Sequence, residues 1–365
     1  MIPLFERYPL LGDTLSFTAL GSYPTPVLDG SKLDVSRHCA GITIKHDGVS
    51  GTPYGGNKVR KLEFLLGAAQ AGGKTSVLTF GGAGSNHALA TAIYAQKLGL
   101  TPHSLLIRQP NSYAVRNNLL RSLETNAKLQ HFESMPGLKA GAILAMTSFL
   151  VRGESLPYLI MPGGSSPVGL LGYVNAAFEL HDQVQAGLLR APDVIYIACG
   201  TLGSCVGLAL GCNILGLKTK ICAVAVTDAG FSSVSKARKL FDCANTLLCN
   251  ADNSIPALRF EECALELRHD FFGTEYGLYT QAGMKAKQRL EDATGLKIEG
   301  CYTGKCVAAL LEDLRLGRLA GQQVLFWNTY DARGGSHSTA HLDYHRLPEK
   351  FHGYFESDVQ PLDRA

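Results

Sequence analysis

The chain has no apolar stretch long enough to cross a membrane as a helix. Its first residues also lack the basic segment followed by an apolar one that marks a secretory signal. A formal net charge of +3 gives no reason to expect nucleic acid or a membrane surface as a partner. No internal repeat and no low-complexity segment interrupts the sequence. These absences favour a globular protein, which we expect in the cytoplasm.

The cysteines form no C-x-x-C pair, although the chain has ten of them. They are scattered, and several (Cys205, Cys212 and Cys222) fall inside apolar strand or helix patterns. Free cysteines are often buried, and thiols stay reduced in the cytosol. We therefore expect buried thiols in a reducing compartment and not a disulfide framework.

Two nucleotide-binding motifs are absent as well. Gly200-x-x-Gly203-x-x-x-Gly207 lacks the G-x-G-x-x-G spacing of dinucleotide-binding folds. Gly72-Gly-Lys-Thr75 resembles the end of a Walker loop, but Ala68 stands where the leading glycine is required. That segment also precedes its strand instead of following one. Both nucleotide interpretations are rejected.

A metal site is not expected, because the sequence has no H-E-x-x-H motif. One other pattern was weighed: His337, His341 and His345, with Asp343, would share one face of a helix. The basic residues around it favour a polar surface instead. The role of the segment 336–365 stays open.

Apolar strand runs alternate with helical patterns along the chain. The expected strands are 42–45, 76–80, 103–108, 158–161, 194–198, 220–226 and 322–327. The expected helices are 59–71, 86–98, 113–126, 137–152, 169–186, 204–215, 282–294 and 304–316. Such alternation predicts an α/β fold with parallel sheets covered by helices. With 365 residues the chain can form two lobes or a single large unit.

A lysine stands in a glycine–asparagine loop, Tyr54-Gly-Gly-Asn-Lys58-Val-Arg-Lys-Leu-Glu-Phe64. The glycines allow the backbone to approach a bound group, and the apolar spacing starts a helix after Asn57. Lys58 could act as a Schiff-base amine if burial and the nearby Arg60 and Lys61 lower its pKa. A solvated basic helix start is the alternative that this segment alone leaves open.

A second loop follows the apolar run 194–198 and reads Gly200-Thr-Leu-Gly-Ser204 before a small-residue helix pattern. A strand, a glycine loop and a helix in this order direct free backbone N–H groups at an anion, supported by the helix dipole. A phosphate is the expected anion.

Together with Phe80-Gly-Gly-Ala-Gly-Ser-Asn-His87, these loops resemble the pyridoxal-phosphate enzymes of the tryptophan-synthase β-subunit fold (fold type II). Within that group the chain is similar to the branch of 1-aminocyclopropane-1-carboxylate deaminase and D-cysteine desulfhydrase. Further stretches match this branch in order over about residues 8–335: Tyr8-Pro-Leu10, Tyr23-Pro-Thr-Pro26, Pro162-Gly-Gly-Ser-Ser-Pro-Val-Gly-Leu-Leu-Gly172, Glu275-Tyr-Gly277 and Tyr302-Thr-Gly-Lys305.

The resemblance implies two lobes. A large cofactor-binding lobe would comprise residues 1–59 and 166–340, and a small lobe residues 60–165. Residues 341–365 would be a C-terminal extension of unknown role. Pyridoxal 5'-phosphate would lie in the cleft between the lobes. An amino-acid substrate and a homodimer are also expected.

The resemblance further implies the roles of single residues. Lys58 would carry the cofactor and shuttle the substrate's α-proton, while Lys61 approaches the phosphate. Asn86 would bind the cofactor's phenolic oxygen. Ser85, Asn86 and His87 would receive the substrate carboxylate. Ser85-Asn86 is equally read as a helix N-cap, which is compatible with these roles because a helix N-terminus attracts a carboxylate.

The phosphate would be held by main-chain N–H groups of Gly200, Thr201, Leu202 and Gly203. Tyr302 would stack on the cofactor ring, and Tyr276 would lie near the substrate. Taken without the resemblance, each tyrosine is more simply a half-buried packing residue.

The residue after Tyr302 separates the two reactions of the branch. The cyclopropane deaminases have a glutamate there, facing the pyridine nitrogen, whereas this chain has Thr303. Thr329 likewise falls where the D-cysteine desulfhydrases have threonine and the deaminases leucine. A hydroxyl leaves the nitrogen largely neutral, which suffices for eliminating a good leaving group. We therefore expect α,β-elimination from D-cysteine or a close analogue, with 1-aminocyclopropane-1-carboxylate deamination as the alternative.

The chain departs from the family around the expected site. Relatives usually carry Lys-Arg-Glu-Asp before the lysine loop, and this chain has Lys45-His46-Asp47. The loops 48–54 and 328–335 are altered too. A hypothesis of another class is a non-catalytic relative that only binds the cofactor; retention of Lys58 favours an enzyme.

Overall fold

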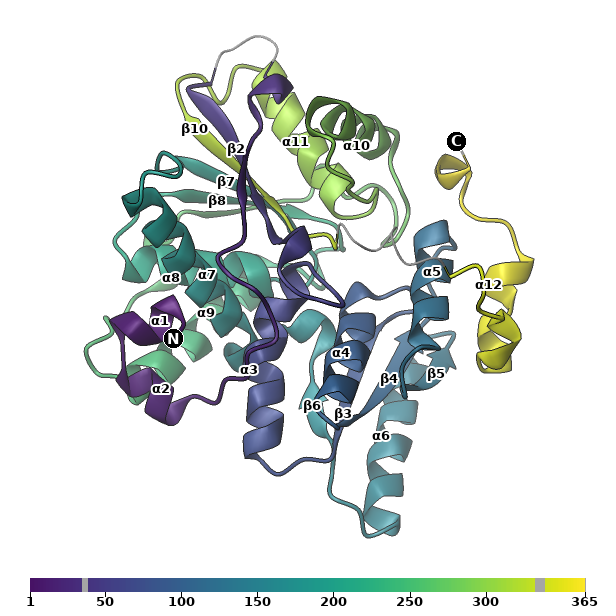
Figure 1. Ribbon diagram of the computed structural model, residues 1–365. Coiled ribbons are helices and arrows are strands. Elements are labelled where there is room, and N and C mark those ends of the chain that lie inside the picture. The colour runs from purple at the N-terminus through teal and green to yellow at the C-terminus, as the bar shows by residue number, and fades with distance from the viewer. Residues whose placement is uncertain (35–38, 332–338, 365) are drawn as a thin grey trace. The chain divides into compact units, whose positions relative to one another are not determined.

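The computed structural model describes residues 1–34, 39–331 and 339–364. The chain forms two compact units (Figure 1). The first consists of Met1–Phe64 and Ser165–Gly334, the second of Leu65–Gly164 and Gly335–Ala365. Helix α3 (Asn57–Ala71) starts in the first unit and ends in the second.

The first unit contains a six-stranded sheet in the order β1-β2-β10-β7-β8-β9. Strand β1 pairs antiparallel with β2, and every other neighbouring pair in this sheet is parallel. The strands are β1 (Val27–Asp29), β2 (Gly41–His46), β7 (Val194–Cys199), β8 (Lys220–Ala225), β9 (Leu265–Arg268) and β10 (Gln323–Asn328). Strand β7 lies in the interior of the sheet and is buried along its whole length. A mainly parallel sheet with such strands is covered on both faces.

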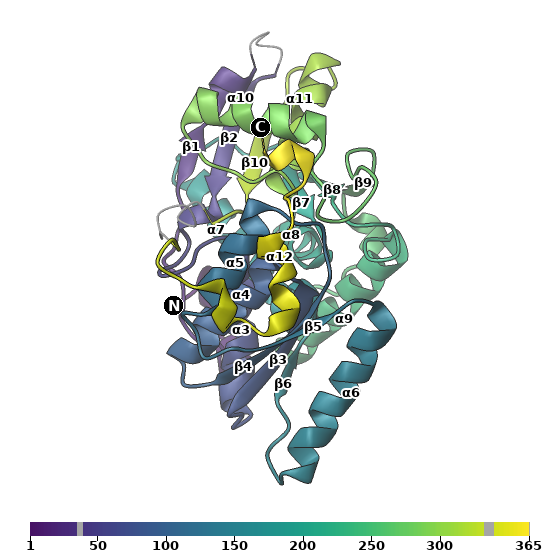
Figure 2. The ribbon, with the colours of Figure 1, turned by 90° about the vertical axis from the view of Figure 1, so that its right-hand side faces the viewer.

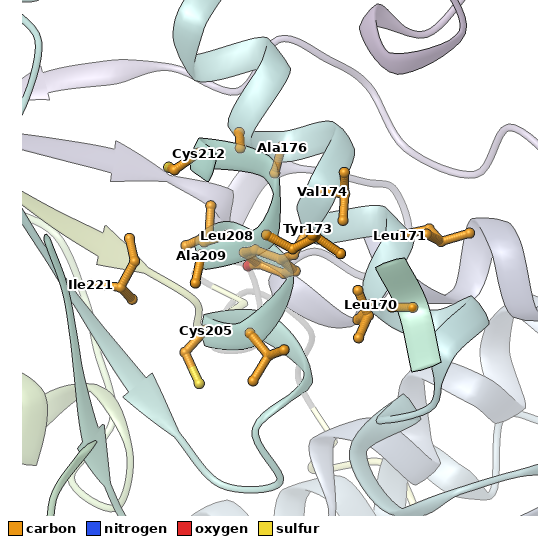
Figure 3. Packing of buried hydrophobic residues seen from close by; sticks show 14 of the residues in the cluster. Leu170, Leu171, Tyr173, Val174, Ala176, Cys205, Leu208, Ala209, Cys212 and Ile221 are labelled. Carbon is orange, nitrogen blue, oxygen red and sulfur yellow. The ribbon is translucent and has the colours of Figure 1, made fainter. Parts of the chain in front are cut away.

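Two apolar cores cover the faces of this sheet, and alternate residues of β7 belong to different cores. Ile195 and Ile197 pack with α7 (Pro167–Gln185), α8 (Gly203–Ile214) and α9 (Val234–Ala251). Val194 and Tyr196 pack with α10 (Gln281–Thr294) and α11 (Thr303–Arg315) on the other side (Figure 1). Close packing of α7 on α8 is visible in Figure 3, where Tyr173 lies beside Leu208 and Ala209. The short helices α1 (Pro3–Arg7) and α2 (Leu10–Thr14) precede the sheet.

The second unit has a four-stranded parallel sheet in the order β5-β4-β3-β6. Its strands are β3 (Ser76–Gly82), β4 (Thr101–Ile107), β5 (Lys128–Phe132) and β6 (Tyr158–Ile160). Its helices are α4 (Asn86–Lys97), α5 (Tyr113–Ser122), α6 (Met135–Val151) and α12 (Gly353–Glu356). Leu105 packs with α6, while its neighbour Leu106 packs with α4 and α5, so helices cover both faces of this sheet too.

The C-terminal segment belongs to the core of the second unit. Leu347, Phe351 and Tyr354 pack with Leu106 and Val115, and Figure 2 shows α12 beside α5. The Tyr354 hydroxyl accepts a hydrogen bond from the backbone N–H of Gln109 at 3.1 Å. Residues 344–364 therefore complete the core of this unit.

The prediction that His341 and His345 share one face of a helix is wrong, because the described part of the chain has no helix that spans these two residues. His337 lies outside the described residues, and His341 precedes a single 3₁₀ turn, Tyr344–Arg346. His345 Nδ1 lies 2.7 Å from Asp343 Oδ1, whereas His341 Nε2 lies 3.9 Å from Glu124 Oε1. The two histidines therefore face different carboxylates. Within residues 1–34, 39–331 and 339–364, no three His, Cys, Asp or Glu side chains are grouped to hold a metal.

All ten cysteines are free thiols. Among the described residues, no helix is both long and apolar enough to span a bilayer.

Candidate active site

The lysine loop ends at the first turn of α3. Asn57 begins the helix, its backbone N–H donates to the carbonyl of Thr329 at 3.1 Å, and its side-chain amide donates to Ser204 Oγ at 3.1 Å. Lys58 Nζ in turn donates to Asn57 Oδ1 at 3.1 Å. Asn57 therefore joins three chain segments, and Lys58 lies directly beside their junction.

The two glycines of this loop are required by close packing against the chain itself. A Cβ on Gly55 would lie 2.2 Å from the carbonyl oxygen of Gly48. Gly56 has a φ of +85°, and a Cβ there would lie 2.8 Å from the carbonyl oxygen of Thr329. Glycine alone is comfortable in such positions. The glycine pattern predicts an approach to a bound group, whereas the close contacts of Gly55 and Gly56 are with the backbone of residues 48 and 329.

A buried ion network holds the start of α3. Arg60 donates to both oxygens of Asp47 at 2.8 and 2.9 Å and to Glu179 at 2.8 and 3.0 Å. Lys45 also donates to Glu179, and Trp327 Nε1 donates to Asp47 at 2.8 Å. Buried charges are tolerated when they are paired and hydrogen-bonded in this way. The network gives Lys45 and Asp47 of the altered segment a structural role and neutralises Arg60.

Because Arg60 is paired, burial is what lowers the pKa of Lys58. Removal of the amine from water brings that pKa down from 10.5 to about 8, while the charges of Cys199 and Glu299 act in the opposite direction. Lys61 is deeply buried, and burial together with the charge of Lys58 lowers its pKa well below the usual value. A lysine whose pKa is lowered has a larger fraction of free amine at physiological pH than an exposed lysine, as a nucleophile or proton shuttle requires.

This shift predicts the pH dependence of Lys58 reactivity. An amine-acylating reagent attacks only the neutral amine, so acylation of Lys58 in the cofactor-free protein should rise with pH around a midpoint near 8. Below that midpoint the ammonium form should protect the residue. Peptide mapping by mass spectrometry over a pH series measures the profile. A midpoint near 10.5 would contradict the burial argument.

The glycine loop follows β7 and opens α8. Leu202 has φ +71° and is the only non-glycine residue with positive φ in the described part of the chain. Such strain in a leucine occurs where the surroundings hold the backbone firmly, often at functional sites. It turns the loop so that α8 begins at Gly203. The Gly200 carbonyl accepts a hydrogen bond from Thr227 Oγ1 at 2.7 Å, which fixes the start of the loop.

A cation and a hydroxyl lie close to the same loop. A Cβ on Gly203 would be 2.7 Å from Lys61 Nζ and 2.6 Å from Ser165 Oγ. Ser165 Oγ accepts a hydrogen bond from the Gly203 N–H at 3.1 Å and lies 2.8 Å from Thr201 Oγ1. A helix N-terminus with a lysine side chain and hydroxyl groups beside it suits an anion, whose charge would in turn favour the protonated form of Lys61. Ser165 was missed as a site residue, although it belongs to the motif 162–172.

The expected tyrosines lie together and one lies against this loop. Tyr276 and Tyr302 have their hydroxyl oxygens 2.7 Å apart. A Cβ on Gly200 would lie 3.2 Å from Cε1 of Tyr302. Burial raises the pKa of both hydroxyls, so each stays protonated at neutral pH. Thr303 follows as a fully buried residue at the start of α11.

The remaining expected residues lie in the second unit, except for Thr329. Ser85 caps α4 by accepting a hydrogen bond from Ala88 N–H at 3.2 Å, as expected. Asn86 Oδ1 accepts a hydrogen bond from Asn118 at 2.8 Å, and His87 is buried in the first turn of α4. The meeting of these three residues with Lys58 stays a prediction.

Comparisons with known proteins show the family to which the chain belongs. The sequence profile of the family described as "Pyridoxal-phosphate dependent enzyme" matches residues 18–329. The chain is 33% identical over 312 residues to a Pyrococcus horikoshii protein provisionally named 1-aminocyclopropane-1-carboxylate deaminase, covering 84% of this chain and 89% of that protein. It is 31% identical over 294 residues to D-cysteine desulfhydrase of Serratia proteamaculans, covering 79% and 86%.

Solved structures give the same result. A structure titled as an ACC deaminase homologue superposes with a TM-score of 0.77 at 29% identity, covering 90% of this chain and 95% of that one. A fungal L-serine ammonia-lyase from Rhizomucor miehei, 17% identical, shares the fold with a TM-score of 0.59, covering 90% and 99%.

The protein is therefore a pyridoxal-phosphate dependent enzyme of α/β fold with parallel-rich sheets. It belongs to the family that contains 1-aminocyclopropane-1-carboxylate deaminase and D-cysteine desulfhydrase. The similar identities to proteins with either name leave the substrate undecided.

The residues of the first unit fit this cofactor. Gly203 leaves space beside Lys61 and Ser165 that even one methyl group would fill, and the α8 N-terminus there suits a phosphate. Tyr302 packs next to the same loop, and Lys58 has the lowered pKa that a carbonyl-binding amine needs.

Proposed function

We propose that this protein catalyses α,β-elimination from D-cysteine or a closely related β-substituted amino acid, giving pyruvate, ammonia and sulfide. Thr303 is the observation that carries the proposal. It is fully buried, follows Tyr302 and has no ionisable group. An uncharged oxygen stabilises a protonated ring nitrogen less than a carboxylate does. The weaker electron withdrawal suffices for expelling a thiol from the β-carbon.

The proposed roles of the chain's own residues rest on the resemblance to the family and are supported by their contacts. Pyridoxal phosphate supplies the electron sink when bound. Gly200, Thr201, Leu202 and Gly203 hold its phosphate with Lys61 and Ser165. Lys58 Nζ would hold the cofactor at its carbonyl carbon, and once the substrate's amine has taken its place the freed Lys58 amine would accept the α-proton of the substrate. Burial lowers its pKa to about 8, so a larger fraction is neutral near physiological pH than in an exposed lysine.

Further residues bind the amino-acid substrate. Ser85, Asn86 and His87 receive the substrate carboxylate at the N-terminus of α4, where the helix dipole favours an anion. Tyr276 and Tyr302 present a pair of protonated hydroxyls, one of which can donate to the departing sulfur. Thr329 contributes to substrate binding. The preference of the protein for the D-amino acid is proposed from the resemblance alone. We also expect a homodimer located in the cytoplasm.

A second candidate is deamination of 1-aminocyclopropane-1-carboxylate to 2-oxobutanoate and ammonia. It is favoured by the provisional name of the Pyrococcus horikoshii relative. A non-catalytic cofactor-binding protein is the candidate of another class. Retention of Lys58 together with the loop 200–204 and Tyr302 argues against it, because a protein that moves no α-proton has no reason to keep a base at this position.

A direct comparison of two substrates tests the proposal. Sulfide release from D-cysteine should exceed 2-oxobutanoate release from the cyclopropane amino acid by at least about tenfold in kcat/KM, a difference of about 1.4 kcal/mol in transition-state stabilisation. Thr303→Glu should reduce this ratio by placing a carboxylate at the position of the hydroxyl. L-cysteine serves as the stereochemical control. Faster turnover of the cyclopropane substrate by the wild type would overturn the threonine argument.

A further inference from the structure

Glu299 is a buried carboxylate that the sequence analysis did not single out. It lies just before α11 and folds back onto the start of that helix. Oε2 accepts a hydrogen bond from the backbone N–H of Cys301 at 2.7 Å. Oε1 accepts from the N–H of Tyr302 at 2.6 Å and of Thr303 at 2.8 Å. The carboxylate thus occupies the N-terminal end of α11.

This arrangement replaces an ordinary helix cap. Tyr302 is the N-cap residue of α11 and makes no side-chain cap hydrogen bond. The first N–H groups of a helix need acceptors, and the positive end of the helix dipole favours an anion. Glu299 meets both needs. A serine or asparagine could accept such hydrogen bonds without charge, so capping alone does not require a buried carboxylate.

Glu299 also fixes the hydroxyl of Thr303. Thr303 Oγ1 accepts a hydrogen bond from the Glu299 N–H at 3.1 Å. Its own proton has acceptors in the Glu299 carbonyl at 3.1 Å and in Oε1 at 3.2 Å. The orientation of this hydroxyl is therefore set by Glu299, and Thr303 can donate to a ligand only by giving up these contacts.

Burial raises the pKa of Glu299 itself, while its hydrogen bonds from the N–H groups of Thr303, Tyr302 and Cys301 act to lower it. In its charged form Glu299 acts on groups of the candidate active site. Together with Cys199 it raises the pKa of Lys58, against the larger effect of burial. It likewise raises the pKa of Lys305 and contributes to the raised pKa of the Tyr276 and Tyr302 hydroxyls. The charge of Lys58 in turn contributes to the lowered pKa of Lys61, after the larger effect of burial.

We propose that Glu299 is a positioning residue of the active site, where it orients the Thr303 hydroxyl and the Tyr302 ring and supplies negative charge to Lys58. This inference rests on the proposed function only in assigning Thr303 and Tyr302 to the cofactor ring. The contacts with α11 and the charge at Lys58 are independent of the substrate.

The test compares Glu299→Gln with Glu312→Gln, the same change at a carboxylate of α11 that pairs with Arg315 on the surface. Glutamine keeps the size and one acceptor but removes the charge. In the cofactor-free protein, the acylation midpoint of Lys58 should fall by on the order of 0.5–1 pH unit in Glu299→Gln. Glu312→Gln should leave it unchanged. This readout needs no substrate, so failure of the D-cysteine proposal does not affect it.

A second readout reports orientation. Visible circular dichroism of the cofactor-loaded protein should change in Glu299→Gln and recover in part in Glu299→Asp. Thr303→Val removes only the hydroxyl; it should alter the dichroism while leaving the Lys58 midpoint in place. It also keeps the test decisive if Glu299→Gln does not fold. Variants that lose thermal stability with an unchanged midpoint and dichroism would show that Glu299 is only a helix cap.

Discussion

Lys58→Ala is expected to lower turnover by roughly 10²–10⁴-fold, the range that a positioned acid–base group contributes. Lys58 is the residue of the lysine loop whose amine is brought to a pKa of about 8 by burial. Alanine removes the amine that we propose as both the attachment point of the cofactor and the base that moves the α-proton. The variant should still bind the cofactor without a covalent bond, because the loop 200–204 and Lys61 remain.

Borohydride reduction of the cofactor-loaded wild type locates the covalent bond independently of activity. The reduced pyridoxyl group should be found on Lys58 by peptide mapping, and Lys58→Ala should incorporate none. Lys61→Ala is the matched control, since it removes a neighbouring buried lysine of the same helix and should weaken binding while leaving Lys58 labelled. An adduct on Lys61 or Lys74 in the wild type would refute the assignment.

Gly203→Asp should reduce cofactor affinity by more than tenfold. The new Cβ alone would lie 2.6 Å from Ser165 Oγ and 2.7 Å from Lys61 Nζ. The carboxylate adds a negative charge where we propose that the phosphate dianion binds, and like charges at short range cost more than ~1 kcal/mol even when well solvated. Titration of the cofactor-free protein, followed by absorbance, measures the affinity.

Two further variants separate the causes of this loss. Gly203→Ala adds the methyl group without charge and should give an intermediate affinity. Gly353→Asp places the same residue where a Cβ has no neighbour within 4 Å, and it should bind the cofactor normally. Unchanged affinity in Gly203→Asp would mean that the loop is only a helix start.

Most secondary structure follows from the local pattern of the sequence. Each of the seven expected strands and eight expected helices overlaps an element of the same kind. The omissions are instructive. Helix α9 was missed although Ala237, Phe241, Ala244 and Leu248 recur at helical spacing and are buried. The strands β1, β5 and β9 were missed because short segments show too little periodicity.

The boundaries of the two lobes could be predicted from the sequence only in part. The sequence predicts one lobe of residues 1–59 and 166–340 and another of residues 60–165. In the structure the chain passes from the first unit to the second after Phe64 and returns to the first at Ser165. The sequence after residue 341 has no periodic pattern that predicts where this segment packs. Phe351 and Tyr354 find their neighbours Leu106 and Val115 more than two hundred residues away in the chain. Such contacts are set by tertiary structure.

The sequence by itself determined the fold class, the cofactor and the family, since local motifs such as Gly55-Gly-Asn-Lys58 and Gly200–Ser204 carry them. Tertiary structure alone decided how the site is supported. Glu179 lies 119 residues from Arg60 in the chain, yet the buried charges of Asp47, Arg60 and Glu179 must pair because isolated ions are costly away from water. Glu299 acquires its importance in the same way, because folding brings its carboxylate to the N-terminus of α11 and its charge to Lys58.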